Sequence, residues 1–176
     1  EKGILHDDVV VTTVMSNLGL YHALTAKGIK YEQTAVGDKY VFECMREHGY
    51  SVGGEQSGHI IFNEHENTGD GLMTALKLLE IMVNTKKSLK ELSEDLFIYP
   101  QLLINTPVKD KHKAMEDPEL LKVVDEVARE LGDEGRILVR PSGTEPLVRV
   151  MVEAKTDELC EQYVNQVIDF INAKGL

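Results

Sequence analysis

The 176-residue sequence has no tryptophan, only 2 cysteines and only 5 prolines, and it contains no long apolar run. Cys44 and Cys160 lie far apart and lack the C-x-x-C spacing of redox and zinc motifs. This cysteine usage is typical of reduced thiols and predicts a cytoplasmic location. No stretch approaches the ~18 apolar residues that a membrane-spanning helix requires, so we expect no membrane partner.

Basic side chains are also scarce. The 19 lysines and arginines are outnumbered by 30 acidic residues, which gives a formal net charge of −11. This charge repels nucleic acid phosphates, so we expect no nucleic-acid partner. With 42% hydrophobic and 28% charged residues, the sequence is typical of a soluble, folded protein. It starts at Glu1 without an initiator methionine or a signal peptide, and we expect it to begin within a longer protein.

What the sequence does contain is an alternation of short apolar runs and amphipathic segments, which predicts a mixed α/β domain over residues 1–97. Apolar or β-branched runs predict strands at 9–14, 31–36, 50–52 and 60–62. Apolar residues at helical spacing predict helices at 18–27, 39–48, 72–83 and 89–96. Asp38 is the expected N-cap of the second helix, and the third helix carries a strongly apolar face.

The pattern restarts near Ile98 and predicts a small β-α-β-β-α domain over residues 98–176. Its expected elements are a strand at 102–108, a helix at 118–131, strands at 137–139 and 147–154, and a helix at 158–173. Prolines at both ends of the first strand indicate an edge position. Val148, Val150 and Val152 share one face of the last strand, so we expect helices to cover that face. The predicted fold class is therefore α/β followed by α+β.

The loop R-P-S-G-T-E-P joins two predicted strands, and another arginine follows it closely. Gly143 lets backbone N–H groups converge on an anion, and the hydroxyls of Ser142 and Thr144 can donate further hydrogen bonds. Arg140 and Arg149 can each pair with two phosphate oxygens. These five residues predict a phosphate-binding site. The alternative interpretation is an ordinary hairpin turn with solvated charges.

A second polar loop, G-G-E-Q-S-G-H, also lies between two predicted strands. Glu55 and Ser57 are suited to bind neighbouring sugar hydroxyls, because a carboxylate accepts hydrogen bonds from two vicinal hydroxyls. His59 can transfer a proton near neutral pH. The alternative is a bulged hairpin in which Glu55 is solvated and His59 is a strand histidine with its hydrogen bonds satisfied.

No metal site is expected in this chain. The run Glu64-His65-Glu66 places consecutive side chains on different sides of an extended segment, so they cannot share one ion. The sequence also lacks a G-x-S-x-G elbow, a Walker loop and an H-E-x-x-H motif. Cys44 lies within a predicted helix and is expected in the core rather than as a nucleophile.

Together, G-E-Q-S-G-H and R-P-S-G-T-E-P resemble motifs of the α-D-phosphohexomutases. The segments T-T-V-M-S-N and V-G-D-K-Y-V are similar to the bacterial branch that acts on glucosamine phosphates, so the resemblance spans nearly the whole chain. It implies a four-domain enzyme that interconverts glucosamine 6-phosphate and glucosamine 1-phosphate. That reaction uses a phosphoserine, a bisphosphorylated intermediate and Mg²⁺. This chain resembles only the third and fourth domains.

The family's phosphoserine loop, of the type T-A-S-H-N-P, and its metal loop, of the type D-G-D-x-D-R, are absent from these 176 residues. The resemblance therefore implies that Mg²⁺ binds outside this chain, in N-terminal domains of the same protein. It also implies that this chain alone is inactive. A non-enzymatic module that binds a sugar phosphate is the alternative to the mutase.

The resemblance also implies a role for each candidate residue. His59 would be the general acid or base, while Glu55 and Ser57 would bind the sugar hydroxyls of a phosphorylated amino sugar. Lys39 would be a further substrate-binding residue, because this branch often carries a basic side chain there. The loop R-P-S-G-T-E-P and the following arginine would hold the phosphate that is not transferred.

Overall fold

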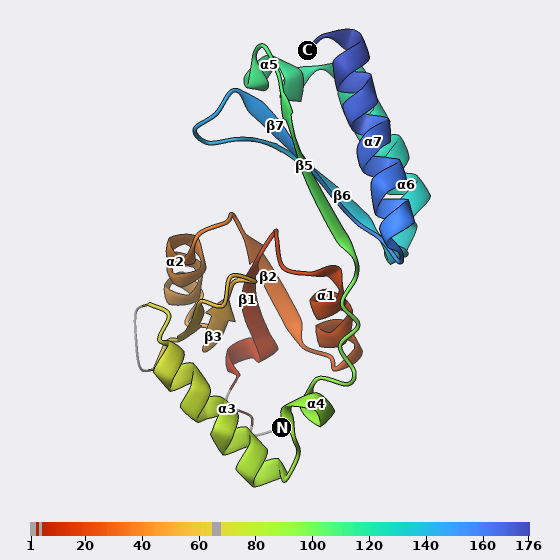
Figure 1. Cartoon of the computed structure of the whole chain (residues 1–176). Helices are drawn as coiled ribbons and strands as arrows, with labels where there is room; N and C mark the ends of the chain where they lie inside the picture. The colour runs from red at the N-terminus through yellow and green to blue at the C-terminus, as the bar shows by residue number, and fades with distance from the viewer. Residues whose placement is uncertain (1–2, 4, 65–67) are drawn as a thin grey trace. The chain divides into compact units, whose positions relative to one another are not determined.

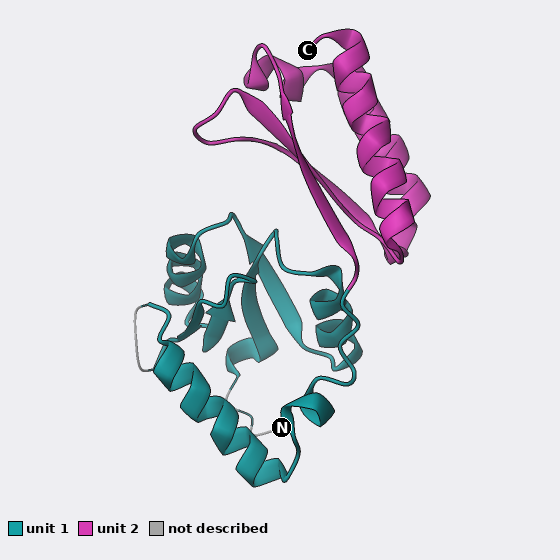
Figure 2. Cartoon of the chain, viewed as in Figure 1, with its two compact units in different colours: residues 1–98 teal, residues 99–176 magenta. Residues whose placement is uncertain are grey.

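The computed structural model describes residues 3, 5–64 and 68–176 (Figure 1). The chain divides into two compact units, Glu1–Ile98 and Tyr99–Leu176 (Figure 2). Each unit contains one sheet of its own. Among the described residues, no helix combines the length and apolar character needed to span a bilayer.

The first unit contains a mixed four-stranded sheet. Its strands are β1 Val9–Thr13, β2 Lys30–Thr34, β3 Val52–Gly54 and β4 Ile60–Phe62, in the order β2-β1-β3-β4. Its helices are α1 Leu18–Ala26, α2 Asp38–His48, α3 Gly71–Thr85 and α4 Leu89–Leu92, and a 3₁₀ turn, η1 His6–Asp8, precedes β1. β1 runs parallel to β2 and β3, whereas β4 is antiparallel to β3. This arrangement confirms the predicted α/β class.

The apolar core of this unit joins β1 to α2. Val9 and Val11 share one face of β1, because alternate strand residues point the same way. They cluster with Val41 and Met45 of α2 and with Ile61 of β4. Val11, Val41 and Met45 are fully buried.

Gly53 of β3 lies against this core and leaves no room for a side chain. A Cβ at this position would lie 2.7 Å from both Met45 Sδ and Val41 Cγ1. Because both neighbours are fully buried, we expect Gly53→Ala to lower the free energy of unfolding of the first unit by about 1–3 kcal/mol. Urea denaturation, followed by NMR signals of this unit, measures the change.

Gly71→Ala is the matched control for this prediction. A Cβ at Gly71 would meet nothing within 4 Å, and the residue opens α3, where alanine is the better helix former. The control should leave the free energy of unfolding unchanged or raise it slightly. Equal losses from both substitutions would contradict the packing explanation.

The start of α2 differs from the prediction by one residue. Its N-cap is Gly37, which has a φ of 134°, and Asp38 is the first helical residue. The Asp38 side chain accepts a hydrogen bond from Lys39 N at 2.8 Å. Gly37 N donates instead to Glu55 Oε1, at 2.9 Å. The predicted Asp38 cap is wrong because the helix already begins at Asp38, so that Gly37, which has no side chain, takes the N-cap position.

The second unit contains a three-stranded antiparallel sheet. Its strands are β5 Gln101–Pro107, β6 Arg136–Pro141 and β7 Leu147–Glu153, in the order β5-β7-β6. Its helices are α5 Lys111–Glu116, α6 Pro118–Leu131 and α7 Asp157–Lys174, and a 3₁₀ turn, η2 Gly132–Glu134, follows α6. The edge position of β5 and the α+β class are confirmed. The short helix α5 is an addition to the predicted order.

Helices α6 and α7 cover the valine face of β7, as predicted. Val148, Val150 and Val152 are fully buried and cluster with Val127 of α6 and Val164 of α7. Figure 1 shows the two helices packed side by side along this sheet. The core therefore fixes β7 and, through its pairing with β6, the loop that joins them.

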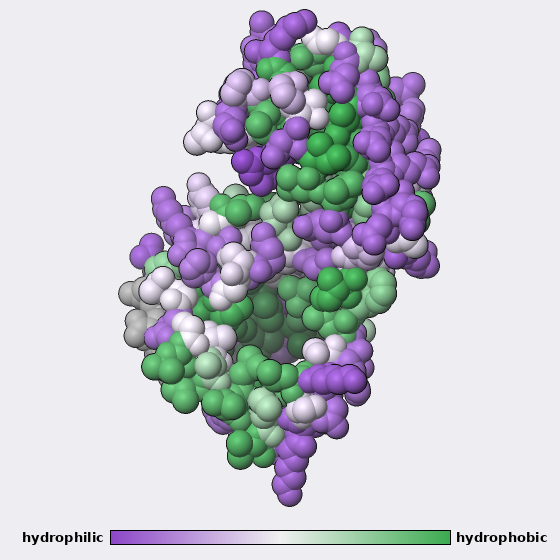
Figure 3. Space-filling model, viewed as in Figure 1, coloured by the Kyte–Doolittle hydropathy of each residue, from purple (hydrophilic) through white to green (hydrophobic). Residues whose placement is uncertain are grey.

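Helix α3 presents an apolar face to solvent. Leu72, Leu76, Leu79 and Val83 follow helical spacing, and each is between 54% and 74% exposed. No described residue of α3 is buried. Figure 3 shows hydrophobic surface over this helix.

Candidate functional site

The two polar loops lie in different units, and each is a hairpin. In the first loop, Gly58 N donates to Glu55 O at 3.0 Å, and Glu55 N donates to His59 O at 2.9 Å. Gly58 has a φ of 97°, which favours glycine in a three-residue hairpin loop. The backbone is thus the bulged hairpin of the alternative interpretation, so any function depends on its side chains.

Side-chain contacts place this hairpin at the carboxyl edge of the parallel strands. The half-buried Glu55 binds Gly37 N after β2, and Gln56 Oε1 accepts from Thr13 Oγ1 at 3.3 Å, at the end of β1. β1 has β2 on one side and β3 on the other. Ligands of open α/β sheets bind outside the carboxyl ends of such strands, where connections diverge. The hairpin therefore occupies a position suited to a ligand.

Buried hydroxyls hold the segment that follows β1. Thr12 Oγ1 donates to Ser16 Oγ at 2.9 Å, and Tyr21 Oη donates to Thr13 O at 2.7 Å. Thr12, Thr13, Ser16 and Tyr21 are all at most 3% exposed. Satisfied buried networks of this kind rigidify their surroundings. The edge that carries the hairpin is therefore held in place.

His59 is exposed and lies next to β4, whereas the alternative interpretation made it a strand histidine with its hydrogen bonds satisfied. Its Nδ1 lies 3.3 Å from Ser57 Oγ. Its Nε2 makes no hydrogen bond to another described residue. Gly69 approaches the ring closely, since a Cβ there would lie 3.1 Å from His59 Cδ2. The ring is therefore supported on one side and has a nitrogen available for proton transfer.

Lys39 lies in the first turn of α2, two residues after the glycine that binds Glu55. Its Nζ is 3.8 Å from Glu43 Oε1 and 5.9 Å from the centre of the Tyr40 ring. It forms no hydrogen bond or ion pair with Glu55 or His59 within the described part of the chain. The structure therefore brings Glu55 to the start of α2 but does not link Lys39 to it.

The second polar loop joins β6 and β7 and carries two arginines. Arg140 and Arg149 are directly opposite each other in the strand register. Like charges in such pairs repel, and burial together with the Arg149 charge lowers the pKa of Arg140. Arg149 Nε is buried with no hydrogen-bond partner among the described residues, and Glu145 Oε2 lies 3.9 Å from its Nη2. An anion with several oxygens would satisfy both arginines.

The backbone of this loop has one closed side and one open side. Ser142 is 1% exposed, and its Oγ accepts from Glu145 N at 3.3 Å. Ser142 N donates to Leu147 O at 2.9 Å, so this residue holds the loop together. Gly143 and Thr144 are exposed, and neither backbone N–H has a partner in the described ranges. Ser142 therefore has a structural contact in addition to its predicted role.

No sequence motif marks Lys111 as a site residue, although its Nζ donates to Ser142 O at 2.6 Å. Nor does a motif mark the contact by which Gln56 joins the first hairpin to β1. Both contacts join residues more than 30 positions apart, so no local sequence motif can predict them. Lysine and glutamine are also common on protein surfaces, so their residue type alone does not indicate a contact with a site.

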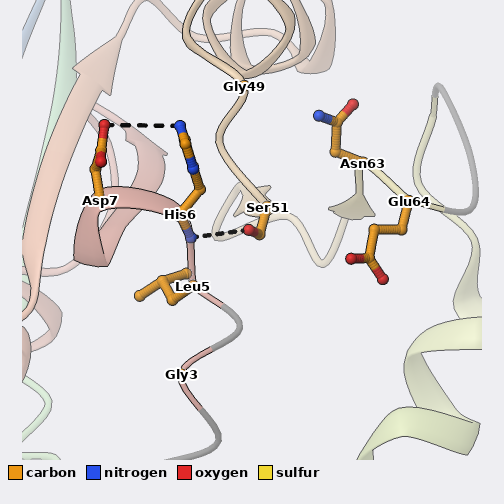
Figure 4. A pocket seen from close by; sticks show the side chains of 8 residues that line it. All are labelled: Gly3, Leu5, His6, Asp7, Gly49, Ser51, Asn63 and Glu64. Carbon is orange, nitrogen blue, oxygen red and sulfur yellow. Dashed lines mark hydrogen bonds and ion pairs between the residues drawn. The ribbon is translucent and has the colours of Figure 1, made fainter.

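A pocket of about 440 Å³ opens at the amino edge of the parallel strands, away from the first hairpin. In Figure 4, His6 and Asp7 lie beside Ser51, and Asn63 and Glu64 lie across from them. His6 Nε2 is 3.7 Å from Asp7 Oδ2, and His6 N donates to Ser51 Oγ at 3.0 Å. None of the predicted site residues lines this pocket.

No group of three or more His, Cys, Asp or Glu side chains suited to a metal ion occurs in the described ranges. Of the run considered in the sequence, Glu64 lines the pocket. The other two members, His65 and Glu66, lie outside the described residues.

Comparisons with protein families match both units. Residues 1–99 match phosphoglucomutase/phosphomannomutase, alpha/beta/alpha domain III, and residues 103–170 match the phosphoglucomutase/phosphomannomutase C-terminal domain. A phosphoglucosamine mutase of Lachnospira eligens is 61% identical over 166 residues, which cover 94% of this chain and 37% of the relative. One from Lachnoclostridium phytofermentans is 57% identical over 175 residues, covering 99% and 39%. The chain thus spans less than two fifths of these curated relatives' length.

Solved structures show the same fold. A phosphoglucomutase/phosphomannomutase family protein from Burkholderia thailandensis aligns with a TM-score of 0.73 and 26% identity, over 94% of this chain and 37% of that one. N-acetylphosphoglucosamine mutase from Aspergillus fumigatus, solved with GlcNAc-6P and magnesium, aligns with a TM-score of 0.76 over 98% of this chain and 40% of that one. At 19% identity, the second likeness concerns the fold alone.

Proposed function

The chain belongs to the phosphoglucomutase/phosphomannomutase family, and on this premise we propose that it is the C-terminal, substrate-binding part of a phosphoglucosamine mutase. The complete enzyme would interconvert glucosamine 6-phosphate and glucosamine 1-phosphate in the cytoplasm. The observation that carries the proposal is the arginine pair of β6 and β7, with the buried, unpartnered Nε of Arg149. Two guanidinium groups opposite each other on neighbouring strands, one of them with an unmet hydrogen-bond donor, supply the charge that suits a phosphate group.

In the second unit, residues 99–176, the phosphate would be held by charge and by the backbone. The guanidinium groups of Arg140 and Arg149 would each bind phosphate oxygens, which relieves their mutual repulsion. The exposed N–H groups of Gly143 and Thr144 would donate two further hydrogen bonds. Ser142 would add its hydroxyl hydrogen, since its Oγ acts as an acceptor within the loop.

In the first unit, residues 1–98, the hairpin would bind the sugar ring. Glu55 uses Oε1 for Gly37 N, which leaves Oε2 to accept from ring hydroxyls. Ser57 would bind a further hydroxyl, and Lys39 would contribute positive charge nearby. His59 would move a proton at Nε2 while Ser57 contacts its Nδ1. A mutase needs both subsites, because the sugar must bind in two orientations while one phosphate stays fixed.

The family implies Mg²⁺, but the described residues of this chain do not fit such an ion, since they form no suitable cluster of ligands. The relatives are much longer than this chain. We propose that the metal ligands and the phosphoserine belong to N-terminal domains of the same protein. This chain would therefore contribute substrate binding and proton transfer by His59.

A coupled assay of the intact protein with glucosamine 6-phosphate and Mg²⁺ tests the proposed activity. We expect formation of glucosamine 1-phosphate, and we expect glucose 6-phosphate to be a poorer substrate. Glucosamine 6-phosphate that binds without conversion would favour the non-enzymatic binding module. Conversion of glucose 6-phosphate alone would contradict the proposed substrate.

Arg149→Ala is expected to weaken binding of inorganic phosphate to this chain by about 10- to 150-fold. The reason is that each hydrogen bond to a charged group contributes roughly 1.5–3 kcal/mol. Arg149→Lys should recover part of the affinity, because lysine keeps the charge but loses the forked geometry. Phosphate titrations followed by amide chemical shifts measure all three affinities.

Arg129→Ala serves as the control for this loss. Arg129 is exposed on α6 and donates within its own helix to Asp125 O, at 3.2 Å. The control removes the same charge and should leave the phosphate affinity nearly unchanged. An Arg149→Ala chain with unchanged affinity would return the loop to an ordinary hairpin.

A further inference from the structure

Lys111 reaches the phosphate loop from α5, the short helix that follows β5. Its Nζ donates to Ser142 O at 2.6 Å and to the carbonyl oxygens of Gly143 and Glu145 at 3.4 Å each. An ammonium group has three hydrogens and no acceptor. Three carbonyls of one loop therefore converge on this group and use its whole donor capacity.

The direction of these carbonyls fixes the direction of the neighbouring amides. The described peptide bonds are trans, and in a trans peptide the C=O and the following N–H point in opposite directions. Because Ser142 O is turned toward Lys111, Gly143 N–H is turned away from it. The same holds for Gly143 O and Thr144 N–H. The third carbonyl, that of Glu145, precedes a proline, which has no N–H.

The base of the Lys111 side chain is itself held in place. Asp110 caps α5 by accepting from His112 N at 3.0 Å and from Lys113 N at 3.2 Å. Ala114 of the same helix is 1% exposed and belongs to the core of this unit. The lysine therefore extends from a packed helix, which lowers the entropy lost when it binds the loop.

From this geometry we infer that Lys111 is a positioning residue for phosphate binding. It draws three loop carbonyls to one side and thereby presents the Gly143 and Thr144 amides, already oriented, to a phosphate on the other side. Lys111 itself does not contact the phosphate. This inference rests on the proposed phosphate-binding function of the loop.

Lys111→Met tests the role, because methionine keeps an unbranched stem and removes the charge and the donors. We expect inorganic phosphate to bind this chain about 10- to 100-fold more weakly, since misdirected Gly143 and Thr144 amides form weaker hydrogen bonds to the charged ion. The amide shifts of Gly143 and Thr144 should also change before phosphate is added, because the loop loses its fixed direction. Lys111→Arg should recover only part of the affinity, because it restores charge and donors but its planar fork does not match three carbonyls that converge on one nitrogen.

Lys113→Met is the matched control. Lys113 lies on the same helix, its side chain is 84% exposed, and its Nζ is 3.8 Å from Asp110. Removal of this charge should change neither the affinity nor the loop shifts. Phosphate affinity of Lys111→Met equal to that of the parent chain would overturn the inference. Weaker binding with unchanged phosphate-free loop shifts would also overturn it, because it would indicate direct contact between Lys111 and phosphate.

A measurement on the unmodified chain keeps the inference testable if Lys111→Met does not fold. NMR should detect a scalar coupling across the hydrogen bond between Lys111 Nζ and the Ser142 carbonyl carbon, and it should persist when phosphate is added. Loss of this coupling on phosphate addition would overturn the role.

The Arg149→Ala variant separates the two proposals: if it binds phosphate normally, the proposed function of the loop fails. If Arg149→Ala alone is impaired, only the Lys111 inference fails.

Discussion

This chain alone is expected to give no turnover above the blank in a coupled assay with glucosamine 6-phosphate and Mg²⁺. Phosphoryl transfer requires a group that carries the phosphate and stabilisation of the charge that develops on it. The sequence contains neither the phosphoserine motif nor the metal motif of the family. The described residues also offer no cluster of metal ligands. A bound and oriented sugar phosphate therefore has no partner for the reaction.

The intact protein, assayed at the same molar concentration, is the control for this result. It should convert the substrate under conditions in which the chain alone only binds it. Turnover by the chain alone that survives repeated purification would show that the chemistry is complete within these 176 residues. Our assignment of the missing groups to other domains would then be wrong.

His59→Ala in the intact protein is expected to lower kcat by about 10²- to 10⁴-fold, the usual contribution of a positioned acid or base. The imidazole is exposed and contacts Ser57 through Nδ1, so its removal takes away the proton-transferring Nε2 without opening the core. KM should change far less than kcat, because Glu55 remains to bind the sugar. Steady-state kinetics measure both constants, and circular dichroism checks the fold.

His48→Ala provides a histidine control in the same unit. His48 closes α2, where its Nδ1 lies 3.1 Å from Cys44 O, and it stacks on Tyr50. Its replacement should leave kcat unchanged. If His59→Ala also retains full kcat with a native spectrum, the acid or base role is wrong and His59 is a surface residue of the hairpin.

Most helices and strands could be predicted because their apolar periodicity is local. The pattern around Val148, Val150 and Val152 predicts both a strand and the face that helices cover, and burial confirms it. Helix α5 was missed because six residues carry too little periodicity to register. The Asp38 cap is wrong by one position, because helix boundaries are the least local part of the pattern and Gly37 takes the N-cap position.

The sequence predicts the two loops of the candidate site, but it does not predict how their side chains and amides are arranged. Glycines, hydroxyls and arginines in short motifs indicate what each loop can bind. The sequence does not show that Arg140 and Arg149 are paired across two strands, because that depends on register. It also does not show which backbone amides are turned outward, because that depends on a lysine 31 positions away. The binding roles of all these residues stay predictions.

The solvent-exposed apolar face of α3 affects the interaction between copies of this chain in solution. Its four apolar side chains favour contact between copies, whereas the net charge of −11 keeps copies apart. Added salt shortens the Debye length to about 8 Å at 0.15 M and weakens only the repulsion. We therefore expect the osmotic second virial coefficient of this chain, measured by light scattering, to fall as ionic strength rises.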